Sequence, residues 1–269
     1  MTANWTDKII EYCREYSIPI EYLSDTLWEP KVVPMIRGKA FEYSVIQRLQ
    51  SILPTNEWIV SKATAGEEAF YHDTDVRVFH KRTGRTLRLE CKLSKKEGYQ
   101  VFADGHAEIK VKCMRSRTLG DSKVKELAPK LGIDENALGA HRDQYVAADF
   151  DIVVTSIGNA FYRTDSKTHH YASKPKKTEQ EFLIKLGCKD PTGIKEFAFN
   201  TMLIAKTKDL IASTSTGIIC SKKQCSNNTN CGFIPNYPTI RFEPNSMQPS
   251  KPWLPIEQAQ TFFKSIVLA

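Results

Sequence analysis

The chain has 269 residues, enough for one large domain or two small ones of about 100–200 residues each. Its hydrophobic fraction of 41% is ordinary for a soluble globular protein, and no apolar run approaches the ~20 residues of a membrane helix. Asp7, Glu11 and Glu15 exclude a signal peptide, so we expect a cytoplasmic protein whose seven cysteines, an odd number, form no disulfides. The net charge of +7 suits a polyanionic partner.

Two helices are expected before residue 54. Residues 6–16 carry a short apolar stripe, and residues 17–33 indicate an ordered connection. Residues 34–53 repeat apolar side chains at helical spacing between Pro34, which suits a helix start, and Pro54, which ends it. Glu42 lies at the edge of this apolar stripe, where a carboxylate is costly without a partner.

A strand is expected around residues 58–63, and a β-hairpin over residues 73–93. Val76 and Val78 alternate with polar residues, and a second apolar alternation runs from residue 87 to residue 93. Gly84 supplies the bend, because it tolerates the positive φ of a tight turn. Cys91 is expected on the apolar face of the second strand, as a small core residue.

The polar face of this hairpin brings two carboxylates and one ammonium group together. The turn places Asp75 across from Glu90 or its near neighbour, with Cβ atoms about 4.5–5.5 Å apart, and Lys92 shares the face of Glu90. Two adjacent carboxylates repel unless a positive charge lies between them, and Mg²⁺ with its preference for oxygen ligands suits the gap. The alternative is an exposed hairpin with ordinary surface ion pairs.

Asp75, followed fifteen positions later by Glu90-Cys91-Lys92, resembles the signature of the PD-(D/E)xK superfamily, the fold of most Type II restriction endonucleases. The usual proline before the aspartate is Thr74 here. The resemblance implies that Asp75 and Glu90 hold Mg²⁺ and that Lys92 assists the attacking water.

Many nucleases of this superfamily also carry a Gly-x-x-x-Glu helix just before the catalytic hairpin, and Gly38 and Glu42 match that spacing. The resemblance therefore implies Glu42 as a further metal ligand. The alternative is a partly exposed Glu42 paired with Lys39 or Arg48.

The chain on either side of the hairpin offers further candidate contacts to a nucleic acid. Residues 67–72 are acidic and end in His72; they are either a solvated loop or a loop that touches DNA or a second metal position. Beyond Lys92 the chain is strongly basic, and residues 107–113 alternate as a strand. The basic side chains expected to follow a phosphate backbone, unless they form a plain solvated face, are Lys95, Lys96, Lys110 and Lys112.

Residues 121–142 are expected to be helical, with a break near Gly132 and with Asp134 as the cap of a second helix. The segment resembles a helix-turn-helix, which would place the helix from Glu135 in the major groove. Pro129 inside the first helix argues against that reading and for a plain helical hairpin.

The rest of the chain carries fewer motifs. Residues 149–156 are expected to form a central strand, beside the strand of Glu90 in the family fold. Residues 164–178, with His169 and His170, read as a surface loop, residues 197–205 as a strand and residues 256–267 as a helix.

Three cysteines close together, Cys220, Cys225 and Cys231, leave zinc binding and free thiols both open. Their spacing is looser than that of a zinc knuckle, and Cys188 is the candidate fourth ligand in space. The same loop offers base or phosphate contacts through Lys222, Lys223 and Gln224.

We therefore expect an α/β chain with a restriction-endonuclease-like mixed central sheet flanked by helices. It forms one domain over residues 1–269, with the catalytic core at 34–156, a helical DNA-contacting insertion at 119–147, and the remaining sheet and recognition loops at 157–269. The resemblance implies a prokaryotic, homodimeric, Mg²⁺-dependent endonuclease that cuts double-stranded DNA at a specific site. The alternatives are a resolvase or repair nuclease of the same fold, or a non-catalytic helix-turn-helix DNA-binding protein.

Overall fold

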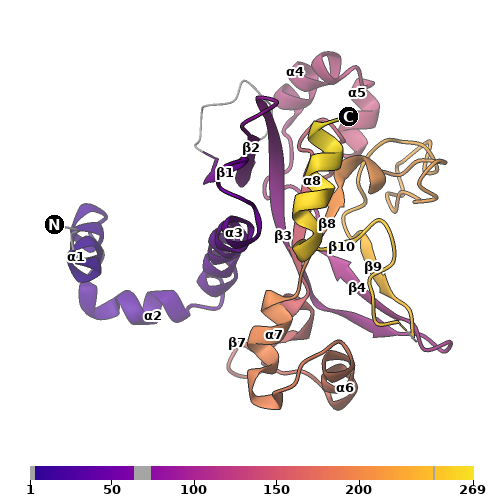
Figure 1. Cartoon of the computed structure of the whole chain (residues 1–269). Helices are drawn as coiled ribbons and strands as arrows, with labels where there is room; N and C mark the ends of the chain where they lie inside the picture. Colours follow the sequence, from indigo (N-terminus) through magenta and orange to yellow (C-terminus); the bar gives the residue numbers. More distant parts are fainter. Residues whose placement is uncertain (1–3, 64–73, 245) are drawn as a thin grey trace.

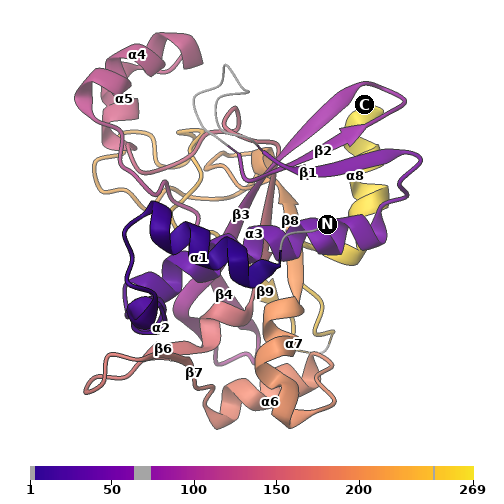
Figure 2. The same cartoon turned by 90° about the vertical axis from the view of Figure 1, so that its left-hand side faces the viewer.

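The computed structural model describes residues 4–63, 74–244 and 246–269 and has a mixed α/β architecture, a curled mixed sheet flanked by helices (Figures 1 and 2). The helices are α1 Trp5–Glu15, α2 Leu23–Trp28, α3 Val32–Ile52, α4 Asp121–Leu131, α5 Glu135–Ala140, α6 Lys177–Lys185, α7 Ile194–Asn200 and α8 Ala259–Val267. Among the described residues, no helix combines the length and the apolar character that crossing a membrane requires.

The main sheet is built around one long strand. The strands are β1 Trp58–Lys62, β2 Val76–His80, β3 Arg85–Val101, β4 Ala107–Val111, β5 Ile152–Ser156, β6 Tyr162–Thr164, β7 Tyr171–Ser173, β8 Met202–Lys206, β9 Thr239–Phe242 and β10 Leu254–Pro255. The described strands of the main sheet follow the order β1-β2-β3-β5-β8-β10, with β3 and β5 parallel and the other neighbours antiparallel. The second half of β3 pairs with β4, which pairs with β9, so β3 belongs to both wings of the sheet.

The two wings meet at an irregular stretch of β3. The pairing with β4 shifts between Ser94 and Tyr99, where β3 carries extra residues. Gly98 is needed at this bulge, because a Cβ atom there would lie 2.6 Å from the Lys95 carbonyl oxygen. Bulges bend a strand and redirect its side chains, and this one lies just after the Glu90–Lys92 segment.

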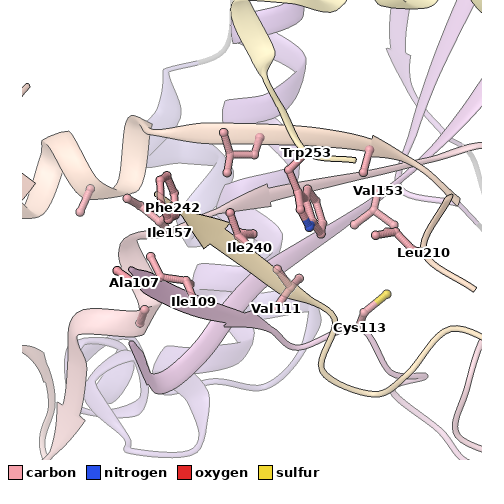
Figure 3. Close-up of a cluster of buried hydrophobic side chains, with 14 of the residues drawn as sticks. Ala107, Ile109, Val111, Cys113, Val153, Ile157, Leu210, Ile240, Phe242 and Trp253 are labelled. Atoms are coloured by element: carbon pink, nitrogen blue, oxygen red, sulfur yellow. The ribbon is translucent and has the colours of Figure 1, made fainter. Parts of the chain in front are cut away.

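Two hydrophobic cores lie on opposite faces of the sheet. Apolar side chains of α3 and α8 cover the face of β2 and β3 that presents Val76 and Leu89. The second core fills the curl between β5, β8 and the β4–β9 wing, where Ile109, Ile240 and Trp253 converge (Figure 3). Because both faces of β5 are covered, its five residues are all buried, as the Ile-Val-Val run predicts.

Most predicted elements are present. The hairpin, the long helix, β4, the central strand β5 beside β3 and the C-terminal helix lie where the sequence places them, within a few residues. The predicted strand at 197–205 is wrong in its first half, because α7 continues to Asn200 and β8 begins only at Met202. Apolar residues alone do not separate a short helix from a strand.

Two predicted loops contain more structure than expected. The connection 17–33 includes the helix α2. The segment 164–178 begins at the end of β6, includes β7 and ends in the first turn of α6, with His169 and His170 between the two strands. Figure 1 shows α1 and α2 as an arm that stands out from the body beside α3. The arm exposes large apolar side chains, namely Trp5, Tyr12, Tyr16, Tyr22 and Trp28.

Candidate functional site

The hairpin carboxylates line a cleft of about 1000 Å³ between α3, the middle of β3 and the segment after β4. The first half of α3 forms one wall with Gly38, Lys39 and Glu42, and Lys112 to Thr118 form another. Asp75, Glu90 and Lys92 line the same cleft. All four residues that the sequence assigns to catalysis or metal binding therefore meet at one hollow.

Strand pairing brings Asp75 beside Glu90. Val76 pairs with Leu89 in the antiparallel register, and the Asp75 N–H donates to the Leu89 carbonyl at 3.1 Å, so the next pair along is Asp75 and Glu90. The Asp75 carboxylate accepts a hydrogen bond from the Cys91 N–H at 2.9 Å, which fixes its Oδ2 atom against β3. Cys91 itself is buried in the core under α3, as predicted.

The carboxylates crowd one another. Burial, followed by the charges of Glu90 and Glu42, raises the pKa of Asp75 from 3.8 to about 7. Glu90 is only 2% exposed, so its charge is weakly screened. A cation would relieve this repulsion, and carboxylate oxygens are the kind of ligand that Mg²⁺ prefers.

Lys92 supplies a positive charge directly beside Glu90. Its Nζ lies 2.5 Å from Glu90 Oε1, and its side chain is 17% exposed. Burial would lower the pKa of Lys92, but the charge of Glu90 outweighs that effect and raises the pKa above its ordinary value. Lys92 is therefore a protonated ammonium at the floor of the cleft.

Tyr145 is a site residue that the sequence analysis missed. Its hydroxyl donates to Glu90 Oε1 at 3.1 Å, and the Lys92 ammonium lies 5.2 Å from the centre of its ring. Burial, followed by the charge of Glu90, raises the pKa of Tyr145, so the phenol stays a hydrogen-bond donor. Nothing in the local sequence marks Tyr145, because 55 positions separate it from Glu90.

Glu42 lines the cleft and is also paired with Lys39, one of the two partners considered for it. It is 5% exposed and lines the cleft with Asp75, but Lys39 and Lys62 both bind its carboxylate, Lys39 at 2.7 Å. Arg48, the other candidate partner, pairs instead with Glu257 at 2.6 Å. The Lys39 side chain is 69% exposed, so this ammonium can leave Glu42 at little cost.

The predicted DNA-contacting lysines divide between the cleft and its surroundings. Lys112 lines the cleft, and Lys110 lies on β4 opposite Thr239. Lys95 and Lys96 lie on the bulge of β3, with Lys95 Nζ 5.1 Å from the Tyr237 ring centre and Lys96 Nζ 2.9 Å from Thr164 Oγ1.

The loop candidates are linked to the cleft by one ion pair. Lys222 binds Asp143, a cleft residue, at 2.5 Å, and Lys223 and Gln224 are exposed. The sequence analysis did not assign Arg117 to the site, yet it lines the cleft and is exposed; its place in the basic run after Lys92 was the available signal.

The helical segment 121–142 forms two helices, α4 and α5. Gly132 ends α4 in the left-handed conformation at φ 64°, and the Asp134 side chain caps α5 by accepting from the Ala137 N–H at 3.0 Å, as predicted. Arg142 binds Asp121 at 2.6 Å, which ties the end of α5 to the start of α4. Residues 67–72, the acidic segment that ends in His72, lie outside the part of the chain that the structure describes.

The three clustered cysteines lie together, but Cys188 is not their fourth partner. Cys188 belongs to the core between the two wings, where its thiol contacts the Asp190 carbonyl at 3.2 Å. His141 takes the fourth position instead. No local pattern links His141 to the cysteines, because 79 positions separate it from Cys220.

Comparisons of the chain with protein-family models, curated proteins and solved structures find no significant match.

Proposed function

We propose that this protein is a Mg²⁺-dependent endonuclease of the PD-(D/E)xK type with a restriction-endonuclease-like fold, which hydrolyses phosphodiester bonds of double-stranded DNA at a specific short site. One observation carries the proposal: Asp75, Glu90, Lys92 and Glu42, which are separated in the sequence, line one open cleft. An ordinary surface hairpin would not bury Glu90 to 2% exposure beside a second carboxylate. Buried, mutually repelling carboxylates in a cleft are typical of functional sites.

Each residue has a role that follows from its surroundings. Asp75 and Glu90 would hold the cation, and Glu42 would join them when Lys39 turns away. Tyr145 and the Cys91 N–H fix the orientation of the two carboxylates before a substrate arrives. When bound, Mg²⁺ supplies positive charge to the phosphate oxygens and lowers the pKa of a coordinated water.

Lys92 acts as a fixed positive charge and not as a base, because its ion pair with Glu90 keeps it protonated. A phosphate over the cleft floor would lie beside its ammonium, which would orient the attacking water and offset the negative charge that develops at phosphorus. Lys112 and Arg117 on the cleft wall would bind neighbouring phosphates, and Lys95, Lys96 and Lys110 would extend this contact along the β4 wing.

Recognition of a particular site would come from the exposed loop residues Lys223 and Gln224 and from Lys222. Their link to the cleft is Asp143, which binds Lys222 and lines the cleft. A cut through both strands needs two active sites, and the described chain has one such carboxylate cleft, so we propose a homodimer. The apolar side chains exposed on the α1–α2 arm offer a surface for the second copy.

Incubation of the purified protein with a plasmid of known sequence tests the proposal. Discrete fragments that appear with Mg²⁺ and disappear with excess chelator are the expected result, and sequencing the ends gives the site. A smear would favour the alternative of a less specific nuclease, such as a resolvase or a repair nuclease. Intact plasmid with a gel shift would favour a protein that only binds DNA, for which the α4–α5 pair is the candidate element. The molar mass from light scattering, at the protein concentration used for cleavage, shows whether the protein is a dimer.

A further inference from the structure

A second cluster of metal-binding side chains lies where α5 meets the loop between β8 and β9. His141 follows the last residue of α5, and Cys220, Cys225 and Cys231 come from the loop. The ligand atoms of all four residues lie within 4.8 Å of one another, and among the described residues no other three His, Cys, Asp or Glu side chains, the cleft carboxylates included, form so close a group. All the cysteines of the described chain are free thiols, so no disulfide accounts for the convergence.

The spacing fits a tetrahedral ion. His141 Nε2 lies 3.5 Å from Cys220 Sγ. Zinc with tetrahedral bonds of about 2.3 Å to sulfur and about 2.0 Å to nitrogen separates these two atoms by roughly 3.5 Å. The observed contact is therefore already the one that a shared ion requires.

The imidazole is oriented for ligation. His141 Nδ1 lies 2.7 Å from the Ala137 carbonyl oxygen, which can only accept, so Nδ1 carries the proton and Nε2 presents its lone pair to the sulfur atoms. Phe233 stacks on the ring with a 4.1 Å centroid separation and an interplanar angle of 7°. A ligating histidine commonly donates its other N–H to a backbone carbonyl in this way.

A hydrogen-bond donor beside Cys220 suits a thiolate. The Lys222 N–H donates to Cys220 Sγ at 3.5 Å. This N–H is the donor that the structure places on the sulfur, and a metal-bound thiolate accepts it more strongly than a neutral thiol does.

The loop buries very few of its own side chains. Within residues 213–232, Cys220 is the only buried residue, and the segment is rich in Ser, Thr, Asn and Lys. Such a polar segment cannot hold a fixed shape through a hydrophobic core of its own. Metal binding is a known replacement for a missing core.

We propose that His141, Cys220, Cys225 and Cys231 bind one structural Zn²⁺. Four protein ligands close the coordination sphere, so this site has no open position for a substrate. The ion joins α5 to the loop that carries Lys223 and Gln224. It also anchors the segment from His141 to Tyr145, and Tyr145 binds Glu90 in the cleft.

Metal analysis of the full chain, purified without chelator from zinc-supplemented medium, is the first test. We expect about one zinc ion per chain by mass spectrometry. Less than about a tenth of an equivalent, or iron in its place, would overturn the proposal. Asp75→Asn changes the cleft and leaves the cluster intact, so it should keep its zinc. A failure of DNA cleavage in a protein that retains zinc would therefore count against the proposed function of the cleft and not against the zinc site.

Variants and cobalt substitution assign the ligands. Cys225→Ser, Cys231→Ser and His141→Gln should each reduce the zinc content at least severalfold, whereas Cys188→Ser, which removes a buried thiol outside the cluster, should not. In the wild type, Co²⁺ that replaces zinc should give the intense visible bands of a tetrahedral thiolate site together with a thiolate charge-transfer band. Weak octahedral bands, or equal zinc in Cys188→Ser and Cys225→Ser, would contradict the assignment even if a variant folded poorly.

Discussion

The cleft of Asp75 and Glu90 and the cluster of His141 and Cys220 both gather metal-binding side chains, but with opposite chemistry. The cleft offers carboxylate oxygens around an open volume of about 1000 Å³. The cluster offers three sulfur atoms and one nitrogen within 4.8 Å of one another, with two ligands buried. Hard oxygen ligands in an open cleft suit an exchangeable Mg²⁺ that shares its coordination sphere with a substrate, whereas a closed sulfur site suits a permanent Zn²⁺.

The two sites also differ in what surrounds them. Lys39, Lys62 and Lys92 bind the cleft carboxylates, so positive side chains stand near the position that a cation would take. Around the cluster, by contrast, lie apolar groups such as Phe233 and backbone N–H donors. Under the two proposals, the cleft exchanges its cation during use, whereas the cluster holds a permanent ion that keeps the loop in shape.

The largest expected effect is the loss of cleavage without loss of zinc. Glu90→Gln keeps the size of the side chain and removes a ligand charge, so Mg²⁺-dependent cleavage should fall by on the order of 10³-fold or more. Glu196→Gln, on an exposed α7 residue that pairs with Lys195, is the matched control and should cleave normally. Single-turnover rates with saturating enzyme measure the effect. Equal rates for the two variants would remove Glu90 from the site.

Lys92→Met should reduce the single-turnover rate by about 10²- to 10³-fold, because it removes the positive charge beside the reacting phosphate. Lys264→Met, on α8 and paired with Glu57 at 2.7 Å, removes the same charge at a remote position and should be neutral. Because Lys92 pairs with a buried carboxylate, its removal also lowers stability, and circular dichroism must show that the variant folds. A near-normal rate for Lys92→Met would move the catalytic lysine elsewhere.

A smaller effect concerns stability without divalent cations. Asp75 has a folded-state pKa of about 7 against an ordinary 3.8, so the folded state holds a proton that the unfolded state has lost. Stability therefore falls as the pH rises from about 4 to about 7. Asp75→Asn removes this loss and should melt at least about 2 °C above the wild type at pH 8 in chelator.

Thermal melts at pH 5 and pH 8 measure this difference, which should be smaller at pH 5. A variant that melts below the wild type at pH 8 would show that Asp75 is stabilising in the absence of a metal, and the cleft would then lack the charge repulsion described above.

The smallest expected effects concern single contacts to DNA. Lys112→Ala and Lys223→Ala should each weaken DNA binding severalfold and lower the slope of log affinity against log salt by about one unit. Lys185→Ala, on the exposed face of α6, is the control. Fluorescence anisotropy at several salt concentrations gives both quantities. An unchanged slope for Lys112→Ala would separate the cleft wall from the path of the phosphate backbone.

Local patterns made part of this molecule predictable from the sequence. The alternation in β2 and β3 fixed which face carries Asp75, Glu90 and Lys92, because side chains on a strand alternate with period two. The helical period of α3 likewise placed Glu42 near the core. The coarse α/β class followed from such elements.

Contacts between distant parts of the chain were not predictable. Tyr145 reaches Glu90, and His141 reaches Cys220, only because the segment 141–146 pairs with the chain around Phe233 and Ile234. The three cysteines left zinc binding and free thiols both open, with Cys188 as the candidate fourth ligand. Cys188 is nearer to Cys220 in the sequence than His141 is, but it lies in another core. Tertiary contacts of this kind leave no local signal in one sequence.

Anomalous diffraction from crystals grown with Mn²⁺ and a DNA duplex would show where a cation binds, because Mn²⁺ takes the oxygen sites of Mg²⁺ and is visible at its absorption edge. We expect a manganese peak within bonding distance of the Asp75 and Glu90 carboxylates, next to a phosphate and Lys92. Manganese bound elsewhere with nothing between Asp75 and Glu90 would contradict the proposed metal site.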